Sequence, residues 1–224
     1  MELKIIARIY TDFKEKFGIP RQSGIAADSV GRIVFEKDYR NPSALRGIEG
    51  YSHLWLIWHF SEAEREQWSP TVRPPRLGGN KRVGVFATRS PYRPNPIALS
   101  SVKLCGIEHS EADGDVLIVS GADILDGTPI YDIKPYLKYT DSHEDAEGGF
   151  ADSVQDYRLT VNFPDELLEK IPDSKRAALM TILENDPRPG YKSDSEHEYG
   201  MKFADFEVLF TVLGGTLTVT NIKI

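Results

Sequence analysis

The sequence contains a single cysteine among 224 residues, which excludes an intrachain disulfide. Cys105 lies in an apolar, strand-like stretch, so we expect it to be buried in a protein of the reducing cytoplasm. The five histidines are scattered without zinc-ligand spacing, and we expect no metal site. Long apolar runs are also lacking. LWLIWHF, at 54–60, is far too short to span a membrane, and MELKIIARIY at the start does not resemble a signal peptide.

Two common catalytic signatures are missing. No GxGxxG turn follows a strand and opens a helix, so a dinucleotide-binding Rossmann domain is not supported. No GxSxG occurs either, and nucleophilic catalysis therefore has little support.

Acidic residues are absent from one long segment. The chain has 34 acidic residues and a formal net charge of −7, yet no Asp or Glu lies between Ser69 and Ile107. That segment carries seven of the 27 basic residues, which are Arg73, Arg76, Lys81, Arg82, Arg89, Arg93 and Lys103. A solvated basic loop is one interpretation. Because prolines and glycines restrict the backbone there, a rigid site for an anionic partner is at least as good an interpretation.

Short β-strand signals dominate the first two thirds of the chain. The expected strands are 3–10, 31–36, 53–60, 82–87, 97–106, 116–120 and 130–133. A break in the alternation near Ser100 and Ser101 indicates a β-bulge. Many short strands separated by Gly and Pro turns favour a closed or sandwich-like β domain.

The composition changes after residue 139. The acidic segment DSHEDAEGG, at 141–149, is typical of a loop or linker. A strand at 157–163 is followed by helix signals at 165–168 and from 173 onward, and NDPRPGY at 185–191 stops the second helix. Strands at 203–212 and 216–222 predict a hairpin across a Gly-Gly turn. We therefore expect a mainly β chain with a β domain at 1–162 and a small α+β domain at 163–224.

Three polar groups could carry chemistry. Among the many carboxylates, Asp123 and Asp126 stand out because turn residues surround them. DGTP, at 126–129, is typical of a hairpin turn, although its N–H groups and hydroxyl could also grip a purine edge or a ribose. Arg89 stands among prolines in ATRSPYRPNP and could bind a ligand carboxylate or phosphate, or pair with an internal carboxylate. NDPRPGY could be merely a helix stop. It could also present a polar trio, which is Asp186, Arg188 and Tyr191.

Four long blocks carry a family resemblance. They are KEKFGIPRQ at 14–22, ALRGIEGYSHLWLI at 44–57, VRPPRLGGNKRVGVFATRSPYRPNPIALSSVKL at 72–104 and DILDGTPIYDIKPYL at 123–137. In this order they resemble the TsaA-like family, also called TrmO or YaeB, and NDPRPGY resembles the small extra domain of its bacterial members. The resemblance implies a β-barrel enzyme, acting as a homodimer, that binds S-adenosyl-L-methionine. It also implies the reaction, methylation of tRNA on N6 of threonylcarbamoyladenosine, next to the anticodon on its 3′ side.

The resemblance also implies site residues. Motif matches place cofactor contacts at Gln22, Ser23, Gly24, Phe60, Ser61, Arg89, Leu99, Asp126, Gly127, Thr128 and Pro129. Arg89 would hold the cofactor carboxylate, and Asp126 would accept a hydrogen bond from its ammonium or ribose. The expected catalytic residues are Asp186, Arg188 and Tyr191, and either a carboxylate such as Asp186 or a water molecule would accept the proton. The residues expected to contact RNA phosphates, in the anticodon loop of tRNA, are Arg73, Arg76, Lys81 and Arg82.

Two alternatives belong to other functional classes. A non-enzymatic RNA- or nucleotide-binding barrel would bind RNA without incorporating methyl groups. A methyltransferase for a different substrate would bind the same cofactor but leave this tRNA unlabelled.

Overall fold

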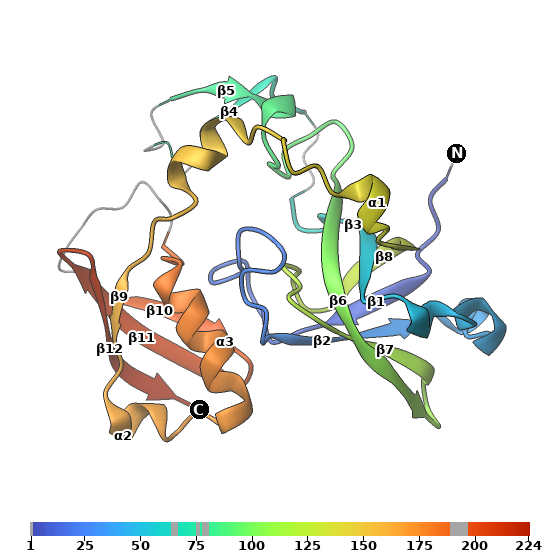
Figure 1. Cartoon of the computed structure of the whole chain (residues 1–224). Helices are drawn as coiled ribbons and strands as arrows, with labels where there is room; N and C mark the ends of the chain where they lie inside the picture. The colour runs from blue at the N-terminus through green and yellow to red at the C-terminus, as the bar shows by residue number, and fades with distance from the viewer. Residues whose placement is uncertain (1, 64–66, 75–76, 78–80, 189–196) are drawn as a thin grey trace.

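The computed structural model describes residues 2–63, 67–74, 77, 81–188 and 197–224, and within them six strands close into a barrel (Figure 1). The strands are β1 (Ala7–Tyr10), β2 (Val30–Phe35), β3 (His53–His59), β6 (Ile97–Ser110), β7 (Gly114–Ser120) and β8 (Thr128–Pro135). They follow each other around the barrel as β1-β2-β7-β6-β3-β8, and every pair is antiparallel.

Apolar side chains at alternate positions of the strands fill the interior of this barrel. In β3 the side chains of Leu54, Leu56 and Trp58 are buried, while those between them face outward and are only partly covered. The facing strands contribute Ile9, Ile33, Val102, Leu117, Val119 and Ile130 to the same core. Each such buried side chain stabilises the fold by about 1.5–3 kcal/mol, so the pattern determines which face of each strand lies inside.

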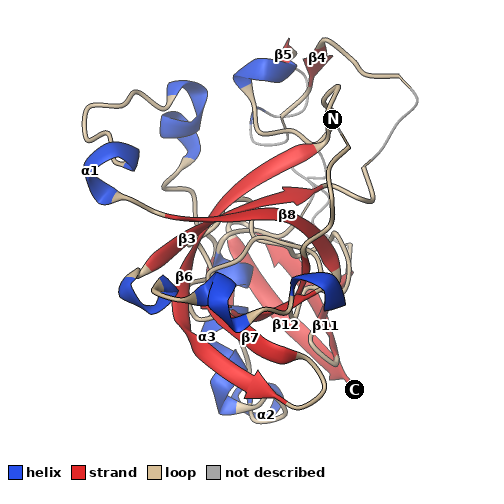
Figure 2. Cartoon of the chain, turned by 90° about the vertical axis from the view of Figure 1, so that its right-hand side faces the viewer, coloured by secondary structure: helices blue, strands red, loops and turns tan. Residues whose placement is uncertain are grey.

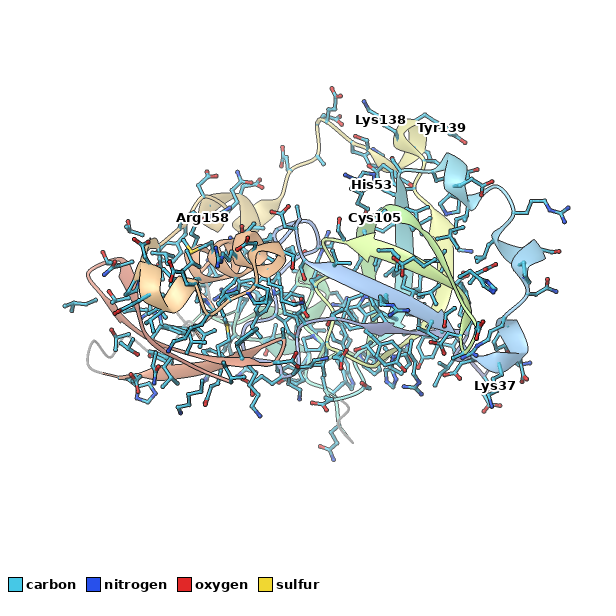
Figure 3. All side chains as sticks on the ribbon, turned by 90° about the horizontal axis from the view of Figure 1, so that it is seen from below. Lys37, His53, Cys105, Lys138, Tyr139 and Arg158 are labelled. Atoms are coloured by element: carbon cyan, nitrogen blue, oxygen red, sulfur yellow. The ribbon has the colours of Figure 1, made fainter. Side chains whose placement is uncertain are left out.

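β6 departs from the expectation in two places. Its alternation continues through Ser100, which points inward and is 1% exposed, and the bulge lies between Leu104 and Gly106 instead. The prediction of a bulge near Ser100 was therefore wrong, because a buried hydroxyl with hydrogen-bond partners can replace an apolar residue. The prediction of a buried Cys105 was also wrong, since this residue lies at the bulge and is exposed (Figure 3).

A second, four-stranded sheet forms in the C-terminal part (Figures 1 and 2). Its strands are β9 (Thr160–Asn162), β10 (Tyr199–Phe203), β11 (Phe206–Leu213) and β12 (Thr216–Lys223), in the order β10-β11-β12-β9. The helices α2 (Asp165–Leu168) and α3 (Asp173–Glu184) lie between β9 and β10 in the chain, and α3 packs into the same core as the strands. The predicted hairpin across Gly214 and Gly215 is confirmed, whereas β10 was not predicted separately from β11.

Short elements occupy the connections. They are β4 (Thr71–Val72), β5 (Val83–Gly84), α1 (Lys138–Asp141) and the 3₁₀ helices Lys37–Tyr39, Pro42–Leu45, Ile48–Gly50, Val85–Ala87 and Gly149–Val154. The strand expected at 82–87 is thus only two residues of β5 followed by a 3₁₀ turn. Asp141 is also more than a linker residue, because its carboxylate accepts hydrogen bonds from the Leu137 N–H and the Trp55 indole. These two bonds lower the pKa of Asp141.

The loop between β1 and β2 joins the barrel to the second sheet. Phe13 packs in the C-terminal core, with its ring centroid 6.2 Å from that of Phe203. Lys175 Nζ donates to both carboxylate oxygens of Asp12, at 2.6 and 2.7 Å. The Ala204 N–H donates to the Asp12 carbonyl at 2.8 Å. One loop therefore fixes the position of the C-terminal sheet against the barrel.

The mainly β prediction is confirmed. The predicted boundary after Asn162, however, would separate β9 from β12, the strand with which it pairs in parallel. No helix in the described ranges is long and apolar enough to cross a membrane.

Candidate functional site

Three loops meet at one end of the barrel. Because neighbouring strands are antiparallel, the ends of β1, β3 and β7 lie together with the beginnings of β2, β6 and β8. The loops that leave this end contain residues 11–29, 60–96 and 121–127. Most of the site residues predicted for the cofactor lie in these loops, so the topology brings together segments that are about 100 residues apart.

Gln22, Arg89 and Asp123 come from these three loops. Arg89 Nη1 donates a hydrogen bond to Gln22 Oε1. The positive charge of Arg89 and the backbone N–H of Ser23 both act on the Asp123 carboxylate, which places Asp123 beside them. The structure thus combines a guanidinium, an amide and a carboxylate at the barrel end.

Asp123 is held by a chain of hydrogen bonds that begins inside the barrel. The Trp58 indole N–H donates to Ser100 Oγ at 2.9 Å, and Ser100 Oγ donates to Asp123 Oδ1 at 2.6 Å. Burial raises the pKa of Asp123, and this effect exceeds the opposing effects of the Ser100 hydrogen bond and the Arg89 charge. Asp123 therefore takes up a proton more readily than an ordinary carboxylate, as a general base must.

Turn residues surround both Asp123 and Asp126 in the sequence, but the family motifs assigned only Asp126 to the cofactor site. A further signal for Asp123 was its position, because it comes soon after the apolar strand that becomes β7 and opens the DILDGTP block. Asp126, in the same block, was assigned as a cofactor contact because it belongs to the recognisable DGTP turn.

The turn at 126–129 uses its hydrogen-bond donors within the protein. The N–H groups of Asp126, Gly127 and Thr128 donate to the carbonyls of Phe13, Ile9 and Leu125, respectively. The Thr128 hydroxyl also donates to the Leu125 carbonyl, and Pro129 has no N–H. Gly127 has a φ of 75°, which a residue with a side chain rarely adopts. These contacts support the interpretation of DGTP as a structural turn rather than as a set of ligand donors.

The Asp126 carboxylate has partners inside the protein as well. Its Oδ1 accepts from the Thr11 N–H at 2.8 Å, and its Oδ2 accepts from Lys14 Nζ at 2.9 Å. Asp126 therefore holds the loop that follows β1, and this is the loop that carries Gln22.

Phe60, Ser61 and Leu99 lie at or near the same end. The Phe60 N–H donates to the Pro96 carbonyl at 2.9 Å, and its ring centroid is 4.4 Å from that of Trp58. Ser61 is exposed next to it. Leu99 is 55% exposed and lies on the outer face of β6, opposite to the inward-pointing Ser100.

The backbones of Gly24 and Gly121, which belong to two of the three loops, approach each other closely. The Gly24 N–H donates to the Gly121 carbonyl at 2.8 Å. A Cβ built on Gly121 would lie 3.3 Å from the Gly24 Cα, and both residues have positive φ angles, of 81° and 78°. Larger residues would push the 22–24 loop away from Asp123.

Asp186 and Arg188 form a bidentate ion pair in the C-terminal part. Arg188 Nε and Nη2 donate to the two oxygens of Asp186 at 2.8 and 2.9 Å, and the Tyr157 hydroxyl donates at 3.3 Å. Burial opposes ionisation, but the bonds and charge of Arg188 outweigh it and lower the pKa of Asp186. Arg21 Nη2 donates to the carbonyls of both residues at 3.1 Å. Tyr191 lies outside the described residues.

The link through Arg21 brings residues 186–188 close to the barrel loops, since Gln22 is the next residue after Arg21. The same link gives these residues a structural role, because it fastens the C-terminal part to the loop that carries the Arg89 partner. A carboxylate with a lowered pKa and a bound guanidinium is a poor proton acceptor.

The basic segment is exposed in its described part. Arg73, Lys81 and Arg82 are exposed where the chain leaves β4 and enters β5. Arg82 Nε donates to Thr71 Oγ1 at 2.7 Å, which fixes its direction. Arg76 lies outside the described residues.

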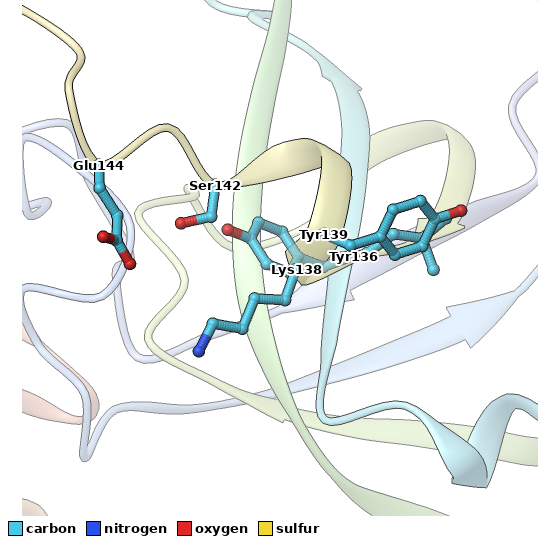
Figure 4. Close-up of a pocket in the computed structure, with 6 residues that line it drawn as sticks. Tyr136, Lys138, Tyr139, Ser142 and Glu144 are labelled. Atoms are coloured by element: carbon cyan, nitrogen blue, oxygen red, sulfur yellow. The ribbon is translucent and has the colours of Figure 1, made fainter.

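An open pocket beside α1 contains none of the predicted site residues. It is lined by Tyr136, Leu137, Lys138, Tyr139, Ser142 and Glu144 (Figure 4). Because α1 follows the end of β8, this pocket and the 126–129 turn lie at opposite ends of that strand. Within the described ranges, no group of three or more His, Cys, Asp or Glu residues is arranged to hold a metal ion.

Family models match both parts of the chain. The tRNA-methyltransferase O N-terminal domain matches residues 8–142, and the TrmO C-terminal domain matches residues 156–224. The chain belongs to the TrmO family. A crystal structure of TrmO from Pseudomonas aeruginosa superposes with a TM-score of 0.79 and 31% sequence identity, over 100% of this chain and 99% of that chain.

Curated relatives of the TrmO family are similar over most of their length. A tRNA (adenine(37)-N6)-methyltransferase of Escherichia coli is 40% identical over 215 residues, which are 92% of this chain and 91% of its own. The Eikenella corrodens protein of the same name is 44% identical over 167 residues, 74% of this chain and 93% of its own. A Pseudomonas aeruginosa protein, provisionally named an S-adenosylmethionine-dependent methyltransferase, is 37% identical over 211 residues, 91% of this chain and 89% of its own.

Proposed function

We propose that this protein is a tRNA methyltransferase that transfers the methyl group of S-adenosyl-L-methionine to N6 of adenine-37. We further propose that the substrate nucleoside at this position is threonylcarbamoyladenosine. Membership of the TrmO family supports the reaction. The structural observation that carries the proposal is the meeting of Arg89 and Asp123 at one end of the barrel, beside Gln22. Arg89 can bind the anionic end of a ligand, and Asp123 can accept a proton.

The residues at this end fit the cofactor. A guanidinium suits the carboxylate of its methionine part, and the close approach of Gly24 and Gly121 holds the 22–24 loop against the loop that carries Asp123. When bound, the cofactor supplies an electrophilic methyl group on a sulfonium. We propose that it is held by Gln22, Ser23, Gly24, Phe60, Ser61, Arg89 and Leu99. The turn formed by Asp126, Gly127, Thr128 and Pro129 supports these loops, chiefly through its internal hydrogen bonds.

Asp123 is the better candidate to accept the proton that N6 loses. Its pKa is raised by burial, while the pKa of Asp186 is lowered by Arg188 and Tyr157. The Ser100 hydrogen bond keeps Asp123 Oδ1 in place. Asp186 and Arg188 then act as positioning residues that hold the C-terminal part against Arg21, and Tyr191 follows them in the chain.

Exposed cations next to the β4–β5 ribbon suit the phosphates of an anticodon loop. Arg73, Lys81 and Arg82 carry this part of the proposal, and Arg76 is the fourth member of the predicted set. The chain is acidic overall, so its affinity for RNA must come from such a local concentration of positive charge. Reversing these charges should weaken tRNA binding and flatten its salt dependence.

We also propose a homodimer in the cytoplasm, where tRNA is modified. Ile97 and Leu99 are 37% and 55% exposed on the outer face of β6, which supports an apolar contact between two copies. Within each copy we place the domain boundary near residue 156, so that β9 stays with the C-terminal sheet.

The first test is methyl transfer from labelled S-adenosyl-L-methionine to tRNA that carries threonylcarbamoyladenosine, beside the same tRNA without it. Label only on the modified tRNA is the expected result. If neither tRNA is labelled while the cofactor binds, the substrate is something else. If the cofactor does not bind either, a binding module without catalysis is the better description.

The cofactor site has its own test in Arg89→Ala. Loss of a charge-assisted contact costs about 1.5–3 kcal/mol, so affinity for S-adenosyl-L-methionine should fall by about tenfold or more in calorimetry. Arg82→Ala removes an arginine from the same basic segment and should leave this affinity unchanged. Equal affinities of the two variants would count against the proposed pocket.

A further inference from the structure

Two large aromatic side chains lie exposed beside the basic ribbon. Phe86 is 70% exposed and Trp68 is 50% exposed. Their ring centroids are 6.0 Å apart, with 30° between the planes, and Arg93 Cζ lies 5.7 Å from the Phe86 centroid. We refer to Trp68, Phe86 and Arg93 as the aromatic platform. Clustered apolar exposure of this kind marks a binding surface more often than scattered apolar residues do.

The backbone holds Phe86 in its outward position. Its neighbour Val85 is 1% exposed, and the Val85 N–H donates to the Pro70 carbonyl at 2.9 Å. The Val85 carbonyl accepts from the Thr88 hydroxyl at 2.8 Å, which closes the turn around Phe86. Arg93 Nη1 in turn donates to the Thr88 carbonyl at 2.7 Å. Since these groups are already ordered, a ligand that binds them loses little conformational entropy.

The surroundings of the platform favour a nucleic acid. Trp68 and Arg93 of the platform line a small pocket together with Gln67, Tyr92 and Pro96. Phe86 and Arg93 belong to the acid-free segment, and Arg73, Lys81 and Arg82 are exposed nearby in the chain. Flat π faces combined with cations are the features by which proteins bind single-stranded RNA.

The platform is also connected to the candidate active site. Arg89 follows Phe86 by three residues, and the Pro96 carbonyl accepts from the Phe60 N–H at 2.9 Å. We propose that the aromatic platform is a stacking site for unstacked bases of single-stranded RNA, and that it receives a base of the anticodon loop close to the methylated one. The identity of that loop rests on the proposed function.

The test compares Phe86→Ala, Phe86→Leu and Phe86→Trp. The probe is a synthetic anticodon stem-loop with threonylcarbamoyladenosine, titrated by fluorescence anisotropy at constant salt. Loss of base stacking should weaken binding about tenfold in the Ala and Leu variants, whereas Trp should retain it, because only a π face stacks. Affinity for S-adenosyl-L-methionine should not change. Tyr139→Ala, which removes an 86% exposed ring in α1, is the matched control and should bind RNA normally.

A second probe, an unstructured oligoadenylate RNA, separates the platform from the tRNA proposal. Binding should quench tryptophan fluorescence in the wild type, and Trp68→Phe should abolish the quenching. If this signal is present while the modified stem-loop is neither bound nor methylated, the platform stands and the tRNA function fails.

Three results would overturn the platform. The first is unchanged affinity of Phe86→Ala for both RNA probes. The second is a loss of cofactor affinity in that variant, which would place Phe86 in the cofactor pocket. The third is a smaller assembly of the Phe86→Ala variant than of the wild type in analytical ultracentrifugation, with RNA binding intact. That result would make this surface a contact between subunits.

Discussion

Asp123 and Asp186 both lie in turns that follow regular elements, yet their environments move their pKa values in opposite directions. Asp123 receives one side-chain hydrogen bond, from Ser100, and burial dominates, so its pKa is raised. Asp186 receives three bonds from Arg188, two from its guanidinium and one from its N–H, and one from Tyr157, and together with the Arg188 charge these outweigh burial. We therefore propose different roles for these two carboxylates. Asp123, for which burial dominates, accepts a proton, and Asp186, which Arg188 and Tyr157 hold, keeps the structure together.

The largest expected effect is the loss of activity in Asp123→Asn. The amide keeps the size of the side chain but cannot accept a proton, and general-base catalysis contributes about 10²–10⁴-fold. Single-turnover methyl transfer should therefore slow by about 100-fold or more, with nearly unchanged affinity for S-adenosyl-L-methionine.

Asp126→Asn is the matched control, because it changes a carboxylate three residues away that we assign to the turn. Its transfer rate should stay within about tenfold of the wild type. If Asp126→Asn is the slower variant, the roles that we assign to these two aspartates are reversed.

The next effect in size is the destabilisation caused by Asp186→Ala. This change leaves Arg188, which is 13% exposed in its side chain, without its partner, and it puts Ala at a φ of 54°. We expect a loss of about 2–3 kcal/mol in the free energy of unfolding, measured by urea denaturation.

Asp186→Asn separates the two causes of that loss, since Asn tolerates positive φ but cannot form the ion pair. It should recover part of the stability. An Asp186→Ala variant with wild-type stability and a transfer rate as low as that of Asp123→Asn would instead make Asp186 the catalytic carboxylate.

The smallest effect is the pH dependence of stability, which should have opposite signs at the two sites. The lowered pKa of Asp186 means that its contribution is present above its unfolded value of about 3.9 and is lost as the pH falls through the lower folded value. The raised pKa of Asp123 means that its ionised form destabilises the fold above the folded pKa, and that this penalty disappears below about 3.9.

Urea unfolding between about pH 3 and about pH 7 should show this contrast. As the pH falls, Asp186→Asn should approach the wild type from lower stability, while Asp123→Asn should lose stability relative to the wild type. Parallel curves for the two variants would show that their environments do not differ as described.

Local patterns predicted much of the fold and part of the site. Alternation located the barrel strands, and the Gly-Gly turn located the hairpin of β11 and β12. The prediction missed the separate strand β10, because Ala204 provides the turn with a φ of 52° where no Gly or Pro signals one. It also misplaced the bulge of β6, since an inward-facing Ser100 looks like an interruption of the apolar pattern.

The sequence by itself determined the mainly β architecture, the concentration of positive charge in one segment, and the motif blocks by which the TrmO family is recognised. Only the tertiary structure decided which polar residues act together. Asp126 belongs to the more recognisable motif, but its oxygens hold Thr11 and Lys14. Asp123 instead depends on Ser100, 23 residues away in sequence, and Ser100 on Trp58, 42 residues away. Burial and hydrogen bonding at such separations arise from strand pairing, which no local pattern contains.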